Sequence, residues 1–114
     1  MPKDEFVYVG HMLDKAHEAL SLVRGKTRHD YDSDTALRLA LTHLIQVIGE
    51  TARRVSSQFR ERHPAIPWDA IAGMRSKIVH DYMDVDEDMV WDSVTQELQP
   101  LIEELKKVLP SESI

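Results

Sequence analysis

The chain has 114 residues, 42% of them hydrophobic, no cysteine and a net charge of −6. This length supports one hydrophobic core but not two, so we expect a single domain over residues 1–114. The negative charge argues against indiscriminate nucleic-acid binding, because phosphate affinity comes mainly from Lys and Arg. The lack of cysteine excludes disulfides, thiolate metal sites and a cysteine nucleophile, while the lack of a long apolar run or a basic-then-apolar leader predicts a cytoplasmic protein without membrane contact.

Apolar residues that recur every three or four positions predict a first helix. It is expected to end at Gly25, because glycine commonly follows the last helical turn. The polar run of residues 26–34 is predicted to be a loop, with Asp32, Ser33 or Asp34 capping the next helix. The apolar positions of the first helix are Phe6, Val9, Leu13, Ala16, Leu20 and Val23.

The longest predicted helix runs from Thr35 to about Arg62. Pro64 ends it, because the residue before a proline is pushed out of the helical conformation. Pro67 suits the first position of a short third helix, which is predicted to reach about Tyr82. The apolar positions of the long helix are Leu37, Leu41, Leu44, Ile45, Ile48, Ala52, Val55 and Phe59.

The last part of the chain predicts a fourth helix. Asp84 and Glu87 have the spacing of a capping box, and an apolar stripe follows from Trp91 to Val108. Pro100 predicts a kink within it, because proline lacks the amide donor of a helical turn. No strand-like alternation or repeat is evident, so we expect an all-α, four-helix up-and-down bundle with a short third helix and a frayed tail at residues 110–114.

Arg75 occupies an unusual place in the third helix. On a helical wheel it falls in the middle of an apolar stripe that includes Ile71, Ile78 and Tyr82. Because arginine is rarely buried without a partner, this position predicts a cleft, a subunit interface or a buried ion pair. Spacing alone favours the ion pair, with Glu50 of the long helix as the best partner.

Ser76 and His80 lie four residues apart, so a continuous helix would make them neighbours beside Arg75. His80 is expected in the last helical turn, where the helix dipole favours a charged imidazolium. A lone histidine there is more often a helix cap than a catalyst. Arg75 beside it nevertheless supplies the minimum needed to cleave RNA through its own 2′-hydroxyl, namely a cation for the phosphate and a proton-transfer group.

Basic residues are concentrated in one part of this acidic chain. Residues 53–63 contain four arginines and a single acid, which predicts weak RNA binding by Arg53, Arg54 and Arg60, with Lys77 as a further contact. Charge alone fits the solvated face of a helix equally well.

No metal or cofactor is expected. Asp84, Asp86 and Asp88 begin like a calcium-binding loop, but Met89 stands where glycine is required. The histidines have no paired ligand spacing, which argues against zinc.

The segment of residues 67–82, PWDAIAGMRSKIVHDY, resembles the signature of HepT proteins, which is Arg, four residues, His, one residue and Tyr. Ile48-Gly49-Glu50 and Trp91 followed by the Leu-Gln-Pro-Leu run agree with this resemblance, which extends from about Asp4 to Leu109. It implies a HEPN-type bundle and a metal-independent endoribonuclease. Such a protein is the toxin beside a minimal nucleotidyltransferase antitoxin.

The resemblance also implies roles for individual residues. Arg75 and His80 would be catalytic, Ser76 and Glu50 would support them, and two copies of the motif would meet in a homodimer or a higher homo-oligomer. Tyr82 corresponds to the tyrosine that the antitoxin modifies with AMP. Ser76 stands where the family commonly has Asn, so a catalytically weak or inactive HEPN dimer, which only binds a nucleotidyltransferase or nucleic acid, stays open as the alternative.

Overall fold

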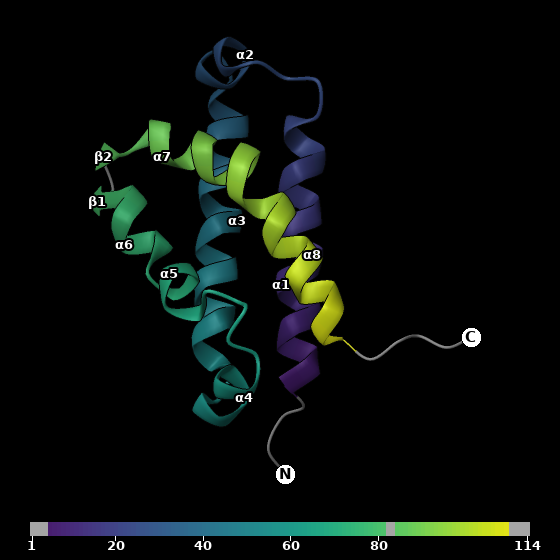
Figure 1. Ribbon diagram of the computed structural model, residues 1–114. Helices are drawn as coiled ribbons and strands as arrows, with labels where there is room; N and C mark the ends of the chain where they lie inside the picture. The colour runs from purple at the N-terminus through teal and green to yellow at the C-terminus, as the bar shows by residue number, and fades with distance from the viewer. Residues whose placement is uncertain (1–4, 82–83, 110–114) are drawn as a thin grey trace.

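The protein is a bundle of antiparallel helices from which a small β-hairpin projects (Figure 1). The structure, a computed structural model, describes residues 5–81 and 84–109. Its elements in chain order are α1 (Glu5–Val23), α2 (Arg28–Asp32), α3 (Thr35–Arg54), α4 (Ser57–Arg62), α5 (Trp68–Ala72), α6 (Met74–Ile78), β1 (Val79–Asp81), β2 (Asp84–Val85), α7 (Glu87–Asp92), the π-helical segment η1 (Ser93–Glu97) and α8 (Leu98–Val108).

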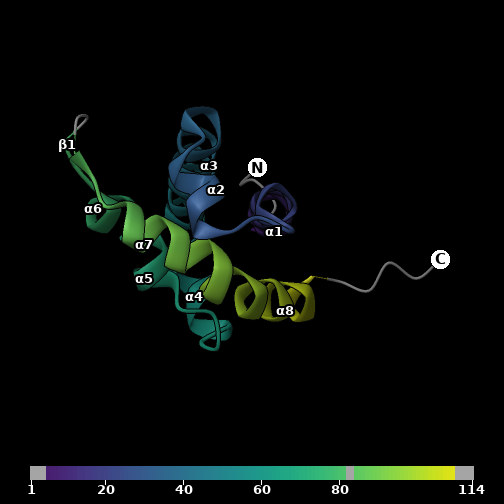
Figure 2. The same ribbon diagram turned by 90° about the horizontal axis from the view of Figure 1, so that it is seen from above.

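The chain passes along the bundle in alternating directions, through α1, α3, α5 with α6, and α7 with α8 (Figure 1). α1 and α3 pack against each other as an antiparallel pair, with α2 at the end that joins them. α5 and α6 return along α3, and α8 packs against α1. Seen from above, the hairpin points away from the bundle (Figure 2). The predicted all-α class is confirmed. None of the described helices is both long and apolar enough to span a bilayer.

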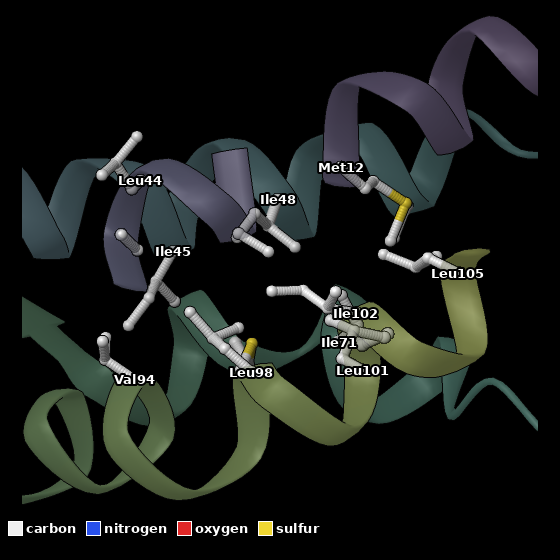
Figure 3. Packing of buried hydrophobic residues seen from close by; sticks show 14 of the residues in the cluster. Met12, Leu44, Ile45, Ile48, Ile71, Val94, Leu98, Leu101, Ile102 and Leu105 are labelled. Atoms are coloured by element: carbon white, nitrogen blue, oxygen red, sulfur yellow. The ribbon is translucent and has the colours of Figure 1, made fainter. Parts of the chain in front are cut away.

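The hydrophobic core lies between α1, α3, α5 and α8. In Figure 3, Met12 of α1 and Ile48 of α3 point toward the side of the core where Leu105 of α8 lies, and all three have no exposed surface. Helical spacing explains this, because residues three or four apart share one face of each helix. The two long helices therefore each turn one apolar face toward the core.

Gly49 permits a close contact between α3 and α5. A Cβ atom at this position would lie 2.9 Å from the carbonyl oxygen of Ile71. That distance is shorter than van der Waals contact, so any larger residue would push α5 away from α3.

Residues 26–34 were predicted to be a loop, but they contain α2. Thr27 and Asp30 form a capping box, in which the side chain of each accepts the backbone N–H of the other. Asp34, one of the three predicted caps, accepts the N–H of Leu37 at the start of α3. Local side-chain hydrogen bonds therefore turn a polar run into a short helix.

The prediction of one continuous helix up to Arg62 is wrong, since the chain breaks between α3 and α4. Val55 is extended, with ψ of 135°, and Ser56 accepts the N–H of Phe59 to start α4. Phe59 is then buried against the bundle. The apolar spacing was correct on both sides of the break, which is why it did not reveal it.

The predicted third helix, from Pro67 to Tyr82, is also interrupted. α5 and α6 meet at Gly73, and α6 ends at Ile78, where the chain becomes strand β1. β1 pairs antiparallel with β2, placing Val79 opposite Val85. Tyr82 and the tail of residues 110–114 lie outside the described residues.

The start of α7 differs from the predicted capping box of Asp84 and Glu87. Asp86 is the cap, because its carboxylate accepts the N–H of Met89. The backbone N–H of Asp86 also donates to the carbonyl of Ile78, at 2.7 Å. This bond ties the end of α6 to the start of α7 across the hairpin.

α2 is joined to the start of α7 by a polar network. The hydroxyl of Tyr31 donates to the carboxylate of Glu87, which also lies 3.7 Å from Nε of Arg38. Arg28 pairs with Asp88 at 2.7 Å. Burial, followed by the hydrogen bond to Glu87, raises the pKa of Tyr31 well above its usual value. The network fixes α7, and with it the second strand of the hairpin.

The irregularity predicted at Pro100 lies in the preceding turn. Proline has no N–H for a helical hydrogen bond and crowds the turn before it. The chain widens there into η1, in which the N–H of Leu98 donates to the carbonyl of Ser93, five residues earlier. The helix thus continues into α8 through a π turn.

Candidate active site

Arg75 lies on α6 with its side chain exposed, not in the middle of the buried stripe that was predicted. The buried residues of α5 and α6 are Ile71, Met74 and Ile78. The helical wheel failed because it assumed one uninterrupted helix, whereas the chain breaks at Gly73. Arg75 therefore lies on the flank of α6, where its guanidinium reaches solvent.

The predicted ion pair between Arg75 and Glu50 is not formed between these two described side chains. Glu50 is exposed on α3 and lines a groove of about 370 Å³ between α1 and α3, together with His43 and Arg54. Arg75 does not line that groove.

His80 lies in strand β1 and is exposed. The expectation that it ends a helix, with its charge favoured by the helix dipole, is therefore wrong. For the same reason Ser76, which is exposed on α6, is not its neighbour on one helical face. α6 ends at its C-cap, where the N–H of Val79 donates to the carbonyl of Arg75, and the chain then continues as a strand.

Arg75 and His80 are nevertheless carried by one short, anchored segment. Ile78 between them is only 1% exposed, and its carbonyl accepts the N–H of Asp86. Neither motif side chain has a hydrogen bond or ion pair with another described residue. A guanidinium with five donors can bind phosphate, and an imidazole can accept or donate a proton. The anchored backbone therefore presents both groups to solvent.

The arginines predicted to bind RNA have different surroundings. Arg53 and Arg54 are exposed in the last turn of α3. Arg60 instead donates to the carbonyls of Ala52, Arg53 and Val55, at 3.2, 3.1 and 3.0 Å. Sequence reasoning missed this capping role, although an arginine shortly after a helix end is a known partner of unpaired carbonyls.

Lys77 lies on the opposite flank of α6 from Arg75. Two residues apart correspond to about 200° around a helix. Lys77 lines a separate groove, between α5 and α6 on one side and η1 and α8 on the other. We call this the α6–α8 groove.

Two of the three acidic residues that resembled a calcium loop have structural partners. Asp86 caps α7, and Asp88 pairs with Arg28. Within residues 5–81 and 84–109, no three His, Asp or Glu side chains form a group suited to a metal ion.

Comparison with known proteins identifies similar sequences over nearly the whole chain. The family model described as "Ribonuclease HepT-like" matches residues 12–108. A Caldanaerobacter subterraneus protein named "Putative RNase" is 31% identical, covering 92% of this chain and 94% of that protein. A Thermococcus cleftensis protein named "Probable ribonuclease HepT" is 30% identical, covering 84% and 91%.

A longer relative shows the same similarity within a larger chain. The Methanocaldococcus jannaschii protein named "Gamma-glutamylcyclotransferase and putative RNase" is 30% identical over 96% of this chain, but this match covers only 49% of that protein. No solved structure matches significantly.

Proposed function

The chain belongs to the ribonuclease HepT-like family, and we propose that it is a metal-independent endoribonuclease with Arg75 and His80 as catalytic residues. The observation that carries the proposal is the exposure of both side chains on the anchored α6–β1 segment, without a described partner that would explain them structurally. The names of the relatives, which describe ribonucleases, support it.

The proposed reaction uses the RNA itself as the nucleophile. His80 removes the proton of a ribose 2′-hydroxyl, whose oxygen forms a bond to the adjacent phosphorus. Arg75 binds the charged oxygens of the phosphorane. The bond to the 5′-oxygen then breaks and that oxygen takes up a proton, which leaves a 2′,3′-cyclic phosphate and a 5′-hydroxyl.

RNA cleavage in the presence of EDTA tests the proposal. We expect the purified protein to remain active, and Arg75→Ala and His80→Ala each to lower the rate about a hundredfold or more. Lys106→Ala, which removes an exposed cation from α8, is the matched control. Wild-type activity in His80→Ala would contradict the catalytic role. Intact RNA binding without cleavage by the wild type would favour the alternative of an inactive HEPN dimer.

RNA is the proposed substrate, and Arg53 and Arg54 are its proposed phosphate contacts outside the motif. Both are exposed, whereas Arg60 is engaged with carbonyls and Lys77 faces away from Arg75. In the inactive His80→Ala background, Arg53→Gln should make the plot of log RNA affinity against log salt concentration less steep by about one unit of slope. Fluorescence anisotropy across several salt concentrations measures it.

We propose that the active form is a homodimer or a higher homo-oligomer in which two motifs meet. One chain supplies one motif histidine, whereas the reaction transfers one proton from the 2′-oxygen and one to the 5′-oxygen. Two copies of His80 could divide these steps. Sedimentation should show a dimer or larger species at micromolar concentration, and a monomer that cleaves RNA would contradict this part of the proposal.

Control by a partner completes the proposed function, which is that of a cytoplasmic toxin. A minimal nucleotidyltransferase antitoxin would attach AMP to Tyr82, two residues after His80. The added phosphate would attract the guanidinium of Arg75, which RNA binding needs, and the adenosine would occupy space that the RNA would take. Co-expression with a neighbouring nucleotidyltransferase should add AMP-sized mass to the wild type but not to Tyr82→Phe, and an unchanged modification pattern would place the control elsewhere.

A further inference from the structure

The α6–α8 groove is an apolar cavity of about 330 Å³ that the proposed reaction does not use. Its lining is built from α5 and α6 on one wall and from η1 and α8 on the other. Ile71 of α5 and Leu101 of α8, which are labelled in Figure 3, both line it. Such a volume and such a lining are typical of a binding site.

Small and rigid residues keep the groove open. Ala65 and Ala70 are exposed on one wall and Pro100 lies on the other, so these three positions place no long side chain in the space. Met89 lines the same groove and is 37% exposed. A flexible methionine at an apolar surface suits contact with a variable partner.

The rim of the groove carries more negative than positive charge. Glu97 and Glu104, seven residues apart, lie on the side of η1 and α8, and Lys77 lies on the side of α6. Glu97 has no ion pair among the described residues. Glu104 has only the exposed Lys107 at 3.2 Å, a kind of pair that contributes little. Both carboxylates are therefore available to a basic ligand.

We propose that the α6–α8 groove docks an amphipathic helix of a protein partner, with apolar residues facing the groove and Lys or Arg facing Glu97 and Glu104. Both walls are helical, so an extended peptide would gain no main-chain hydrogen bonds from them, whereas a helix satisfies its own. Basic residues about two turns apart on that helix would match the spacing of the two carboxylates.

The acidic rim disfavours the other occupants. Phosphate groups of RNA or of anionic lipids would meet two carboxylates and a single lysine. A second copy in a symmetric dimer would bring four carboxylates and only two lysines into one interface. The proposal concerns binding alone and does not depend on RNA cleavage.

Methionine methyl NMR of the full chain tests the proposal directly. Met74 and Met89 line the groove, whereas Met12 is fully buried between α1 and α8 and serves as the internal reference. The probes are helical peptides of about 18 residues, a length that supports a helix in water. Each has an apolar stripe of Leu, Phe or Met flanked by Lys, and each has a twin with Glu in place of Lys.

We expect at least one Lys peptide to shift the signals of Met74 and Met89 but not that of Met12, and the Glu twins to bind at least tenfold more weakly. Glu97→Lys combined with Glu104→Lys should weaken the Lys peptide about tenfold. Glu103→Lys, a charge reversal next to Glu104 but outside the groove lining, should have little effect.

Three results would overturn the proposal. The first is that no Lys peptide shifts Met74 and Met89, or that the Glu twins bind equally well. The second is that a single-stranded RNA produces these shifts and the peptides do not. The third is that the two signals move with protein concentration alone, because the occupant would then be a second copy of the chain.

Discussion

The long helices α1 and α3 and the segment from α5 to β2 are built in different ways. α1 and α3 have 19 and 20 residues and bury one side chain every three or four positions. No helix or strand from α5 to β2 is longer than five residues, and Arg75 and His80 are exposed there. The first region provides the packed core. The second presents polar side chains on a short backbone that the buried Ile78 and its hydrogen bond from Asp86 anchor to the bundle.

This difference separates the packed core from the segment that we propose carries the chemistry. A group that must meet substrate cannot also fill the core, so it lies on a segment with few buried contacts. Substitutions in the two regions should therefore affect different measurements.

The largest loss of stability is expected from shortening a core residue. Ile48 has no exposed surface, so Ile48→Ala should lower the free energy of unfolding by about 2–5 kcal/mol. Leu39 on the same helix is 67% exposed, and Leu39→Ala is the matched control with little expected change. Urea unfolding of both variants measures the contrast, and equal losses would show that α3 does not divide into a buried and a solvent face.

Gly49→Ala tests the contact between the two regions. The added methyl group would press on the carbonyl of Ile71, so we expect a loss of about 1–3 kcal/mol. Gly10, within α1, has open space at the corresponding position. Gly10→Ala should therefore be neutral or stabilise the helix by about 0.5–1 kcal/mol. Thermal unfolding distinguishes the two, and a stabilised Gly49→Ala would mean that α5 can move away without cost.

Tyr31→Phe removes the hydroxyl that joins α2 to Glu87, with an expected loss of about 1.5 kcal/mol. The raised pKa of Tyr31 adds a pH dependence. The folded state holds this proton more tightly than the unfolded state, whose pKa is about 10, so the stabilisation is present below about pH 10 and is lost as the pH rises further. Unfolding measured from pH 8 to 11 should show this decline in the wild type, and a similar decline in Tyr31→Phe would assign it to another group.

The smallest change in stability is expected where activity changes most. Arg75→Ala and His80→Ala remove exposed side chains without described partners, so each should alter the free energy of unfolding by less than about 0.5 kcal/mol. Calorimetry on the same samples used for RNA cleavage checks this. Strong destabilisation would mean that these side chains support the fold.

The sequence was informative where regular helical spacing decides the structure. Val9, Ala16 and Leu41 were assigned to apolar stripes and are fully buried. Gly25 was assigned to a helix end and has the positive φ, 74°, that glycine tolerates there. These assignments need only local rules, which explains their success.

The motif residues could be named from the sequence, but their conformation could not. His80 was placed in a helix because a helical wheel contains only local spacing. It has no information about the hydrogen bond from the N–H of Asp86 to the carbonyl of Ile78, which joins the two ends of the hairpin. Similarly, the capping of α3 by Arg60 depends on how α4 folds back. Tertiary contacts of this kind override the local period.

The number of residues in the π-helical segment η1 determines the direction in which the hairpin leaves the bundle. A π turn contains one residue more than an α turn, as if one residue had been inserted into a straight helix. Every fourth residue from Val90 to Ile102 is fully buried, although steps of four in a continuous α-helix would drift by about 40° each. Deleting one residue of η1 would therefore turn α7 and the hairpin by about 100° relative to α8. The number of residues in this turn, more than the identity of any one of them, sets the angle at which His80 leaves the bundle.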